Sequence, residues 1–336
     1  DMVYKLIKEE VPLENLSRFL DDLVEYSSAY AIIASKNDDT DIEYFDIKRN
    51  YQVRSLLAAI EVLYKREMIT EDDCKTCFHN LRNFFFLFHS CSYTSNKTDK
   101  AIANAAFDVY HTKSEMDFKY VISDVFRELS KFISSSTVDE LMFTTSSMHY
   151  SLKNSAYKSN HRIVKYILYC LYMPDQRDTV LDQSRLTIEH LLNDDGSVRN
   201  SSIYNLTLTS GEINSNELKN RGLVEKIGIL KSQSSVIANQ KLDEYLDAQG
   251  EYLEDKRKND LKKQAISNVF KYEGSPFGYT KEMVDGYLKM KRALQSDEEL
   301  LAVLLERGMN IQAYLSNNPA MQDAYNRFLT LCGTTS

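Results

Sequence analysis

The sequence predicts a mainly α-helical protein, a helical bundle with one small β-containing module inserted into it. All ten glycines of the 336 residues lie at or after Gly196. Glycine is disfavoured inside helices, so the long first part is typical of stacked helices. Apolar residues recur there at helical spacing, as at Leu16, Leu20 and Leu23. Turn-forming and β-branched residues replace this pattern over 185–232.

The apolar spacing of the first part places its helices in order. We expect them over residues 12–35, 47–67, 72–90, 98–111, 117–134, 137–150 and 160–172. Thr137 and Glu140 have the spacing of a capping box. Pro174 is expected to end the last helix because proline cannot donate a backbone hydrogen bond. The aromatic run 84–86 is interpreted as helix core rather than as a platform for stacking bases.

The inserted module has the order strand, loop, strand, helix. Residues 186–188 (LTI) are β-prone, and 193–196 (NDDG) form a turn cluster. A second strand is predicted over 203–209, which is rich in β-branched and aromatic residues. Residues 211–220 then lead into a helix that carries Lys226.

From about residue 236 the pattern is helical again. The charged stretch 243–263 is interpreted as a solvated helix face. Its basic segment 256–258 has phosphate contact as the less favoured alternative. We predict three parts: a helical domain (1–180), the β-containing module (181–235), and a C-terminal helical region that packs on the rest (236–336).

Composition limits the classes of function. The net charge of −8 gives no support to general, tight binding of nucleic acid, although DNA held in a local cleft stays compatible with it. Five cysteines are few and odd in number, which favours a reducing cytoplasm over a disulfide scaffold. No apolar run approaches the ~20 residues of a membrane helix, so we expect no membrane association.

The module contains residues suited to cleaving a phosphodiester bond with one metal ion. His190 can act as general base, and Glu189 can ligate a hard cation such as Mg²⁺ or Mn²⁺. Asn205 could hold the imidazole and its loop, and Asn214 could offer an amide oxygen to the cation. Adjacent strand residues face opposite sides, so Glu189 and His190 share a site only if the strand ends or twists there.

These motifs together resemble a known nuclease family. Residues 188–191 (IEHL), 203–208 (IYNLTL), 212–215 (EINS) and 225–226 (EK) look like the HNH (ββα-metal) domain at the C-terminal end of GmrSD-type modification-dependent restriction and phage-defence enzymes. The helices before them, including 81–84 (LRNF), resemble that family's helical region more diffusely.

The resemblance implies both a function and residue roles. His190 would be the general base, Asn205 the orienting residue, Asn214 and Glu189 the metal site, and Lys226 a phosphate contact or a brace. The implied protein is a metal-dependent DNA endonuclease or nickase that restricts foreign or modified DNA in the cytoplasm. In that family a nucleotide-binding domain or subunit usually precedes this part, and the sequence shows no glycine-rich phosphate loop.

The sequence departs from the family pattern at several positions. Asn193-Asp194 replaces the usual Pro-Gln, Tyr204 replaces Gly, and one extra residue lies between Asn214 and Asn220. A non-enzymatic alternative is therefore a degenerate module that binds a partner or a second copy of the chain. RNA as the substrate is a third possibility.

Each candidate residue also has a purely structural interpretation. Asn214 could cap the next helix, with Asn216 as the ligand instead, and Glu189 could be a solvent-facing carboxylate. A less favoured zinc site would use Cys74 and Cys77 together with His79, His89 and Cys91.

Overall fold

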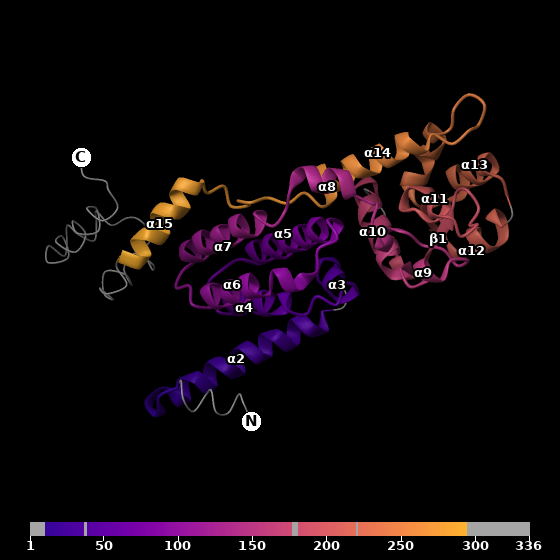
Figure 1. Ribbon diagram of the computed structural model, residues 1–336. Coiled ribbons are helices and arrows are strands. Elements are labelled where there is room, and N and C mark those ends of the chain that lie inside the picture. The colour runs from indigo at the N-terminus through magenta and orange to yellow at the C-terminus, as the bar shows by residue number, and fades with distance from the viewer. Residues whose placement is uncertain (1–10, 37–38, 177–180, 220, 294–336) are drawn as a thin grey trace.

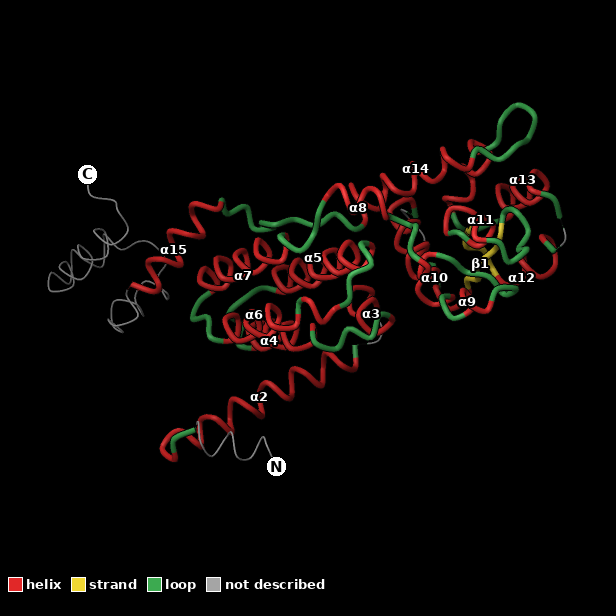
Figure 2. The backbone as a smooth tube through the Cα atoms, viewed as in Figure 1, coloured by secondary structure: helices red, strands yellow, loops and turns green. Residues whose placement is uncertain are grey.

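The computed structural model describes residues 11–36, 39–176, 181–219 and 221–293, and its fold is mainly α-helical (Figure 1). This confirms the predicted fold class. Within the described residues the β strands form one two-stranded antiparallel sheet, a small part of a helical fold (Figure 2). Two isolated bridges add to it. The part of the predicted C-terminal region after residue 293 lies outside the described residues.

The first part of the chain is a layered helical bundle. Its α-helices are α2 (Leu16–Ser35), α3 (Thr40–Ile47), α4 (Val53–Lys65), α5 (Glu71–Ser90), α6 (Asp99–Tyr110), α7 (Glu115–Ser130) and α8 (Ser135–Leu141). The helices α9 (Ser155–Lys158) and α10 (His161–Tyr172) follow, and α10 contacts both α3 and the sheet. Helix α4 contacts both α2 and α6, and α5 lies beside α7 in the same bundle (Figure 1). Short 3-10 helices join them at η1 (Leu13–Asn15), η2 (Ser95–Lys97), η3 (Ser146–Met148) and η4 (Met173–Asp175).

Two of the predicted helices are wrong in their bounds. The expected helix 47–67 is α4, which begins only at Val53, and the preceding helix α3 was not predicted. Arg49, whose φ of 53° is left-handed, lies in the turn that separates the two. The expected helix 137–150 ends at Leu141, shortly before Phe143 adopts a φ of 64°. The Thr137 capping box is also wrong, because Ser134 is the N-cap and accepts from the Thr137 amide.

The core of the bundle is centred on α5. The side chains of Phe84, Phe85 and Phe86 are fully buried, which confirms that this run is core. Phe86 stacks on Phe270 with ring centroids 3.6 Å apart. Helix α5 begins at a capping box in which Thr70 accepts from the Asp73 amide and Asp73 accepts from the Thr70 amide.

The segment that contains the predicted site follows α10. It consists of η5 (Gln183–Arg185), β1 (Leu186–His190), α11 (Val198–Ser201), η6 (Ile203–Asn205), β2 (Leu206–Ser210), α12 (Gly211–Ile213), the π-helix η7 (Asn214–Leu218) and α13 (Leu223–Gln233). The strands pair from Leu186 with Ser210 to His190 with Leu206. The second strand was predicted from residue 203; it begins at Leu206, because a 3-10 turn occupies 203–205.

The chain then crosses back over the bundle. It forms η8 (Ile237–Tyr245), α14 (Glu254–Gln264), the π-helix η9 (Ala265–Val269) and α15 (Lys281–Ala293). Residues 270–280, here called the strap, run across the bundle between α14 and α15 (Figure 1). Asn80 and Asn83 of α5 donate to the carbonyls of Glu273 and Lys271 at 2.8 and 2.7 Å.

The charged stretch 243–263 is not one solvated helix. It begins in a 3-10 helix, passes through a loop, and becomes helical again only at Glu254. Arg257, in the basic segment, is 1% exposed. It therefore belongs neither to a solvated face nor to a phosphate contact. No helix within the described ranges is long and apolar enough to span a membrane.

Candidate functional site

Four of the predicted site residues line one pocket. Glu189 and His190 come from the end of β1, Asn214 from the start of η7, and Lys226 from α13. The remaining lining side chains are Asn193, Asp194, Ser215, Leu218 and Lys219. Asn205, the fifth predicted residue, is not part of the lining. The candidate base and both candidate ligands therefore line the same pocket.

Glu189 and His190 both reach this pocket because β1 ends with them. His190 is the last residue of the strand, and the next amide, that of Leu191, donates to the Asn205 carbonyl at 2.9 Å. Both residues are largely buried, at 9% and 8% exposed. Glu189 is therefore not the solvent-facing carboxylate of the alternative interpretation.

The imidazole of His190 is oriented by a backbone carbonyl. Its Nε2 lies 3.0 Å from the carbonyl oxygen of Tyr150, and the two rings stack with centroids 5.9 Å apart. A carbonyl only accepts, so Nε2 donates and Nδ1 is left as the basic nitrogen. Burial lowers the pKa of His190 below its ordinary value, although the Tyr150 carbonyl and the carboxylates of Asp194 and Glu189 oppose this. The imidazole is therefore neutral near pH 7.

Glu189 is held by a buried lysine. Lys226 Nζ lies 2.5 Å from Glu189 Oε1 and 2.6 Å from the His190 carbonyl oxygen. The two side chains of this ion pair are 4% and 11% exposed. Lys226 therefore braces Glu189 and the end of β1, which is the second of the two roles expected for it. A hydrogen bond of this kind fixes the orientation of a ligating carboxylate.

Asn205 organises the loop after β1 rather than the imidazole itself. Its Oδ1 accepts from the Leu192 amide at 2.9 Å, and its Nδ2 donates to the carbonyls of Leu192 and Asn200 at 2.9 and 2.7 Å. The predicted hold on the loop is present. The bonds found for Asn205 within the described residues do not include one to His190, so it acts on the imidazole only through the backbone.

Asn214 is oriented by its amide nitrogen. Nδ2 donates to Thr187 Oγ1 and to the Ile188 carbonyl, both at 3.1 Å. Its Oδ1 accepts no hydrogen bond from the described residues, which leaves this oxygen for a ligand. Asn214 does not cap the helix, because Ser210 fills that role for α12. The alternative ligand Asn216 does not line the pocket.

The pocket lining includes two oxygen donors of the type that hard divalent cations prefer. Glu189 Oε2 and Asn214 Oδ1 are both unengaged by the described residues, and Mg²⁺ takes one or two carboxylates while keeping several waters. Among the described residues no group of three or more His, Cys, Asp or Glu is placed to hold a metal. This applies also to the cysteines of α5, which lie buried in the helical core.

Sequence reasoning missed the role of Asp194 and treated it only as part of a turn. Its carboxylate lines the pocket and accepts from Ser151 Oγ at 2.7 Å and from the Leu152 amide at 2.9 Å. Burial alone would raise the pKa of Asp194, but these bonds, the Gly196 amide and nearby His190 lower it. The Asp-Gly turn was the only local signal, because its partners lie more than 40 residues earlier.

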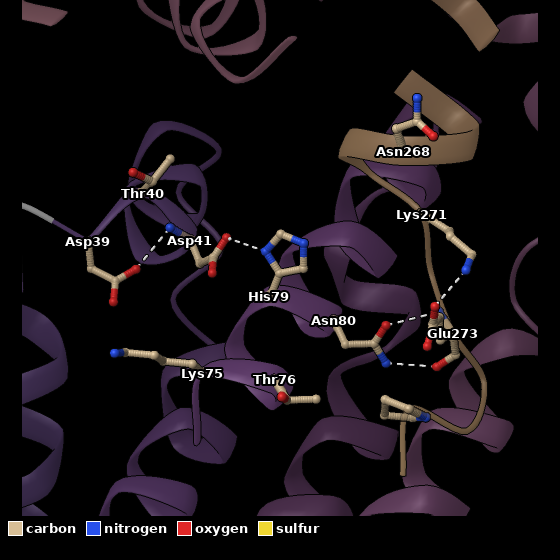
Figure 3. A pocket seen from close by; sticks show the side chains of 11 residues that line it. Asp39, Thr40, Asp41, Lys75, Thr76, His79, Asn80, Asn268, Lys271 and Glu273 are labelled. Carbon is tan, nitrogen blue, oxygen red and sulfur yellow. Dashed lines mark hydrogen bonds and ion pairs between the residues drawn. The ribbon is translucent and has the colours of Figure 1, made fainter. Parts of the chain in front are cut away.

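A second polar cavity lies in the bundle, between α3, α5 and the strap (Figure 3). Several of its charged groups are paired, either with one another or with a residue outside the lining. Asp41 pairs with His79 at 3.3 Å and with Arg82 at 3.2 Å, and Lys271 pairs with Glu273 at 2.7 Å. The Asp41 pairs hold α3 against α5, and Asn80 holds the strap through the backbone of Glu273, so we assign these groups a structural role.

Comparisons of the chain with known protein families, with curated proteins and with solved structures find no match.

Proposed function

We propose that this protein is a metal-dependent endonuclease or nickase that cleaves foreign or modified DNA in the cytoplasm. The observation that carries the proposal is the pocket itself. It combines a neutral, buried imidazole with two unengaged hard oxygen donors, and these three side chains come from β1 and η7. A general base beside a cation site is what hydrolysis of a phosphodiester requires.

The residues divide the work as follows. His190 Nδ1 takes the proton of the attacking water, while Nε2 stays bonded to the Tyr150 carbonyl. Glu189 and Asn214 would hold Mg²⁺ or Mn²⁺ through Oε2 and Oδ1, and Lys226 keeps Glu189 in place. The cation, when bound, supplies charge stabilisation at the scissile phosphate and the leaving oxygen.

A plasmid-nicking assay tests the proposal. The full chain with Mg²⁺ or Mn²⁺ should convert supercoiled DNA to relaxed or linear product, and EDTA should prevent this. His190→Ala should reduce the rate by about 100- to 10,000-fold, because general-base catalysis contributes on that scale. His111→Ala, at the exposed end of α6, is the matched control and should cleave like the wild type.

Circular dichroism of the same samples separates catalysis from folding. If His190→Ala loses both its helical signal and its activity, His190 has a structural role. A wild-type protein that leaves both DNA and RNA intact with either metal would exclude the nuclease function. Cleavage of RNA alone would replace DNA as the substrate.

A second candidate function is a catalytically degenerate module that binds a partner or a second copy of the chain. The Lys226–Glu189 ion pair favours it, because the ammonium already neutralises the candidate metal ligand. Exposed apolar side chains on the bundle also favour it, with Val24 and Phe107 at 67% and 65% exposed. Intact plasmid together with a dimer in analytical ultracentrifugation would support this function.

A further inference from the structure

The partner of His190 comes from outside the strand–loop–strand segment. Tyr150 lies 40 positions before His190, in the loop that joins η3 to α9. That loop is paired with the segment by its backbone. The Tyr150 amide donates to the Ser201 carbonyl at 2.7 Å, and His149 forms an antiparallel bridge with Ser202. The helical region thus supplies one of the groups that orient the candidate base.

Asp194 fastens this loop on its other side. Its Oδ1 accepts from Ser151 Oγ at 2.7 Å, and its Oδ2 accepts from the amides of Leu152 and Lys153 at 2.9 and 3.4 Å. Ser151 Oγ in turn accepts from the amides of Lys153 and Asn154, both at 3.0 Å. The carboxylate therefore organises the residues that directly follow Tyr150.

These bonds occupy the hydrogen-bond acceptor positions of the Asp194 carboxylate. A carboxylate has about four lone-pair positions. Three of them meet the loop, and Gly196 N donates to Oδ1 at 3.0 Å. Asp194 lines the pocket but could bind a cation only by releasing the loop. Its role is thereby distinguished from that of Glu189, which keeps one oxygen unengaged by the described residues.

The turn around Asp194 is shaped for this contact. Gly196 has a φ of +81°, a conformation that suits glycine, and its carbonyl accepts from Asn154 Nδ2 at 2.9 Å. A Cβ at Gly196 would lie 3.5 Å from Lys153 Cβ, so the turn and the loop are in direct contact. The Asp194 side chain of the turn bonds to the loop, and the Asn154 side chain of the loop bonds to the turn.

We propose that Asp194 is a positioning residue for His190. By holding the 150–154 loop, Asp194 keeps the Tyr150 carbonyl against Nε2, which fixes the plane of the ring and leaves Nδ1 as the basic nitrogen. The catalytic half of this inference rests on the proposed function. The structural half, the coupling of Asp194 to the Nε2–H bond, can be measured without any cleavage.

Asp194→Asn is the sharpest variant because it preserves shape. In either orientation of the new amide its NH₂ donor faces a backbone amide that is itself a donor. These are the amides of Leu152 and Lys153 in one orientation and that of Gly196 in the other, so the wild-type set of bonds cannot form. Asp195→Asn is the matched control. The Asp195 carboxylate accepts from the Ser197 amide at 2.9 Å, and its described bonds do not reach the loop.

The first readout is the Nε2–H proton of His190 in the full, metal-free chain, labelled with ¹⁵N-histidine and assigned through His190→Gln. This proton is visible only while a hydrogen bond protects it from exchange with water. We expect it in the wild type and in Asp195→Asn, and we expect it to be lost or broadened in Asp194→Asn. The second readout is the nicking rate, expected to fall about 10- to 100-fold in Asp194→Asn alone.

The outcomes separate this inference from the proposed function. A retained Nε2–H signal in Asp194→Asn, or its absence from the wild type, overturns the inference even if the nicking rate falls. If Asp194→Asn loses the signal and the wild-type protein cleaves nothing, the positioning role stands and the nuclease function is rejected. If Asp194→Asn does not fold, Ser151→Ala replaces it, because it removes one hydroxyl from the same network, and the same readings apply.

Discussion

Arg257 of α14 donates a hydrogen bond to the backbone carbonyl of Leu206, 2.7 Å away, at the residue where β2 begins. The same guanidinium donates to the Tyr172 hydroxyl at 3.0 Å, at the end of α10. One fully buried side chain thus ties the bundle, the sheet and the returning C-terminal segment together. The position of the candidate site relative to the bundle depends on this connection.

Replacing Arg257 should destabilise the whole chain. Arg257→Met retains much of the apolar stem but leaves the Leu206 carbonyl and the Tyr172 hydroxyl without their donor. We expect a loss of about 3 kcal/mol in the free energy of unfolding, because hydrogen bonds from a charged group contribute about 1.5–3 kcal/mol each. Urea denaturation measures this, and the exposed Lys256→Met is the control, with an expected change below about 0.5 kcal/mol.

The Lys226–Glu189 pair should show strong coupling. Lys226→Met leaves a buried carboxylate without its partner, and we expect a loss of about 3–5 kcal/mol in the free energy of unfolding. Adding Glu189→Gln should recover part of that loss, because the uncompensated charge is gone. Lys231→Met on the exposed face of α13 should cost less than about 1 kcal/mol. Additive effects of the two site substitutions would contradict the pairing.

Asn214 should control the dependence of cleavage on metal. In the proposed nuclease its Oδ1 is a ligand, so Asn214→Ala should shift the Mg²⁺ concentration for half-maximal nicking upward by about 10- to 100-fold. Asn216→Ala, two residues further along η7 and outside the pocket lining, is the matched control. Superimposable Mg²⁺ titrations for wild type and Asn214→Ala would remove Asn214 from the metal site.

Acid should destabilise the bundle through His89. Burial, with a smaller contribution from Lys48, lowers the pKa of His89 from 6.5 to about 3. The unfolded chain therefore binds a proton below pH 6.5 that the folded chain refuses. The stabilising contribution is fully present above pH 6.5 and falls by about 1.4 kcal/mol per pH unit below it.

The measurement is urea denaturation at pH 7, 6 and 5. His89→Gln should weaken the fall in stability with acid, whereas Tyr44→Phe should preserve it, because it removes the hydroxyl 3.0 Å from His89 Nδ1 and leaves the titrating group. Equal slopes for wild type and His89→Gln would assign the acid sensitivity to other groups.

Local chemistry made part of this structure predictable. The apolar pattern located α5 and α10, because α10 buries most of its apolar residues and α5 is buried on all sides over residues 80–90. It missed α3 and placed the start of α4 too early, because the left-handed turn at Arg49 has no signal in the local sequence. It also read 243–263 as solvated, since no local pattern shows that Arg257 meets partners 51 and 85 residues away.

The site was predictable to the same extent. Glu189, His190 and Asn214 were found from their spacing, because β1, its turn, β2 and η7 follow one another along the chain. The roles of Tyr150 and Asp194 were not found, because both depend on hydrogen bonds between the 150–154 loop and residues of the later segment. A sequence pattern within residues 181–235 cannot contain that bond.

The origin of the Tyr150 carbonyl also limits how this pocket can be transplanted. A fragment cut at residue 181 would keep the imidazole, the amide and the lysine, yet lose the acceptor that orients the base. Grafting those residues alone onto another scaffold would transfer the side chains of the pocket without the backbone carbonyl that orients His190. The shortest segment that contains the complete pocket begins no later than His149, inside the helical region.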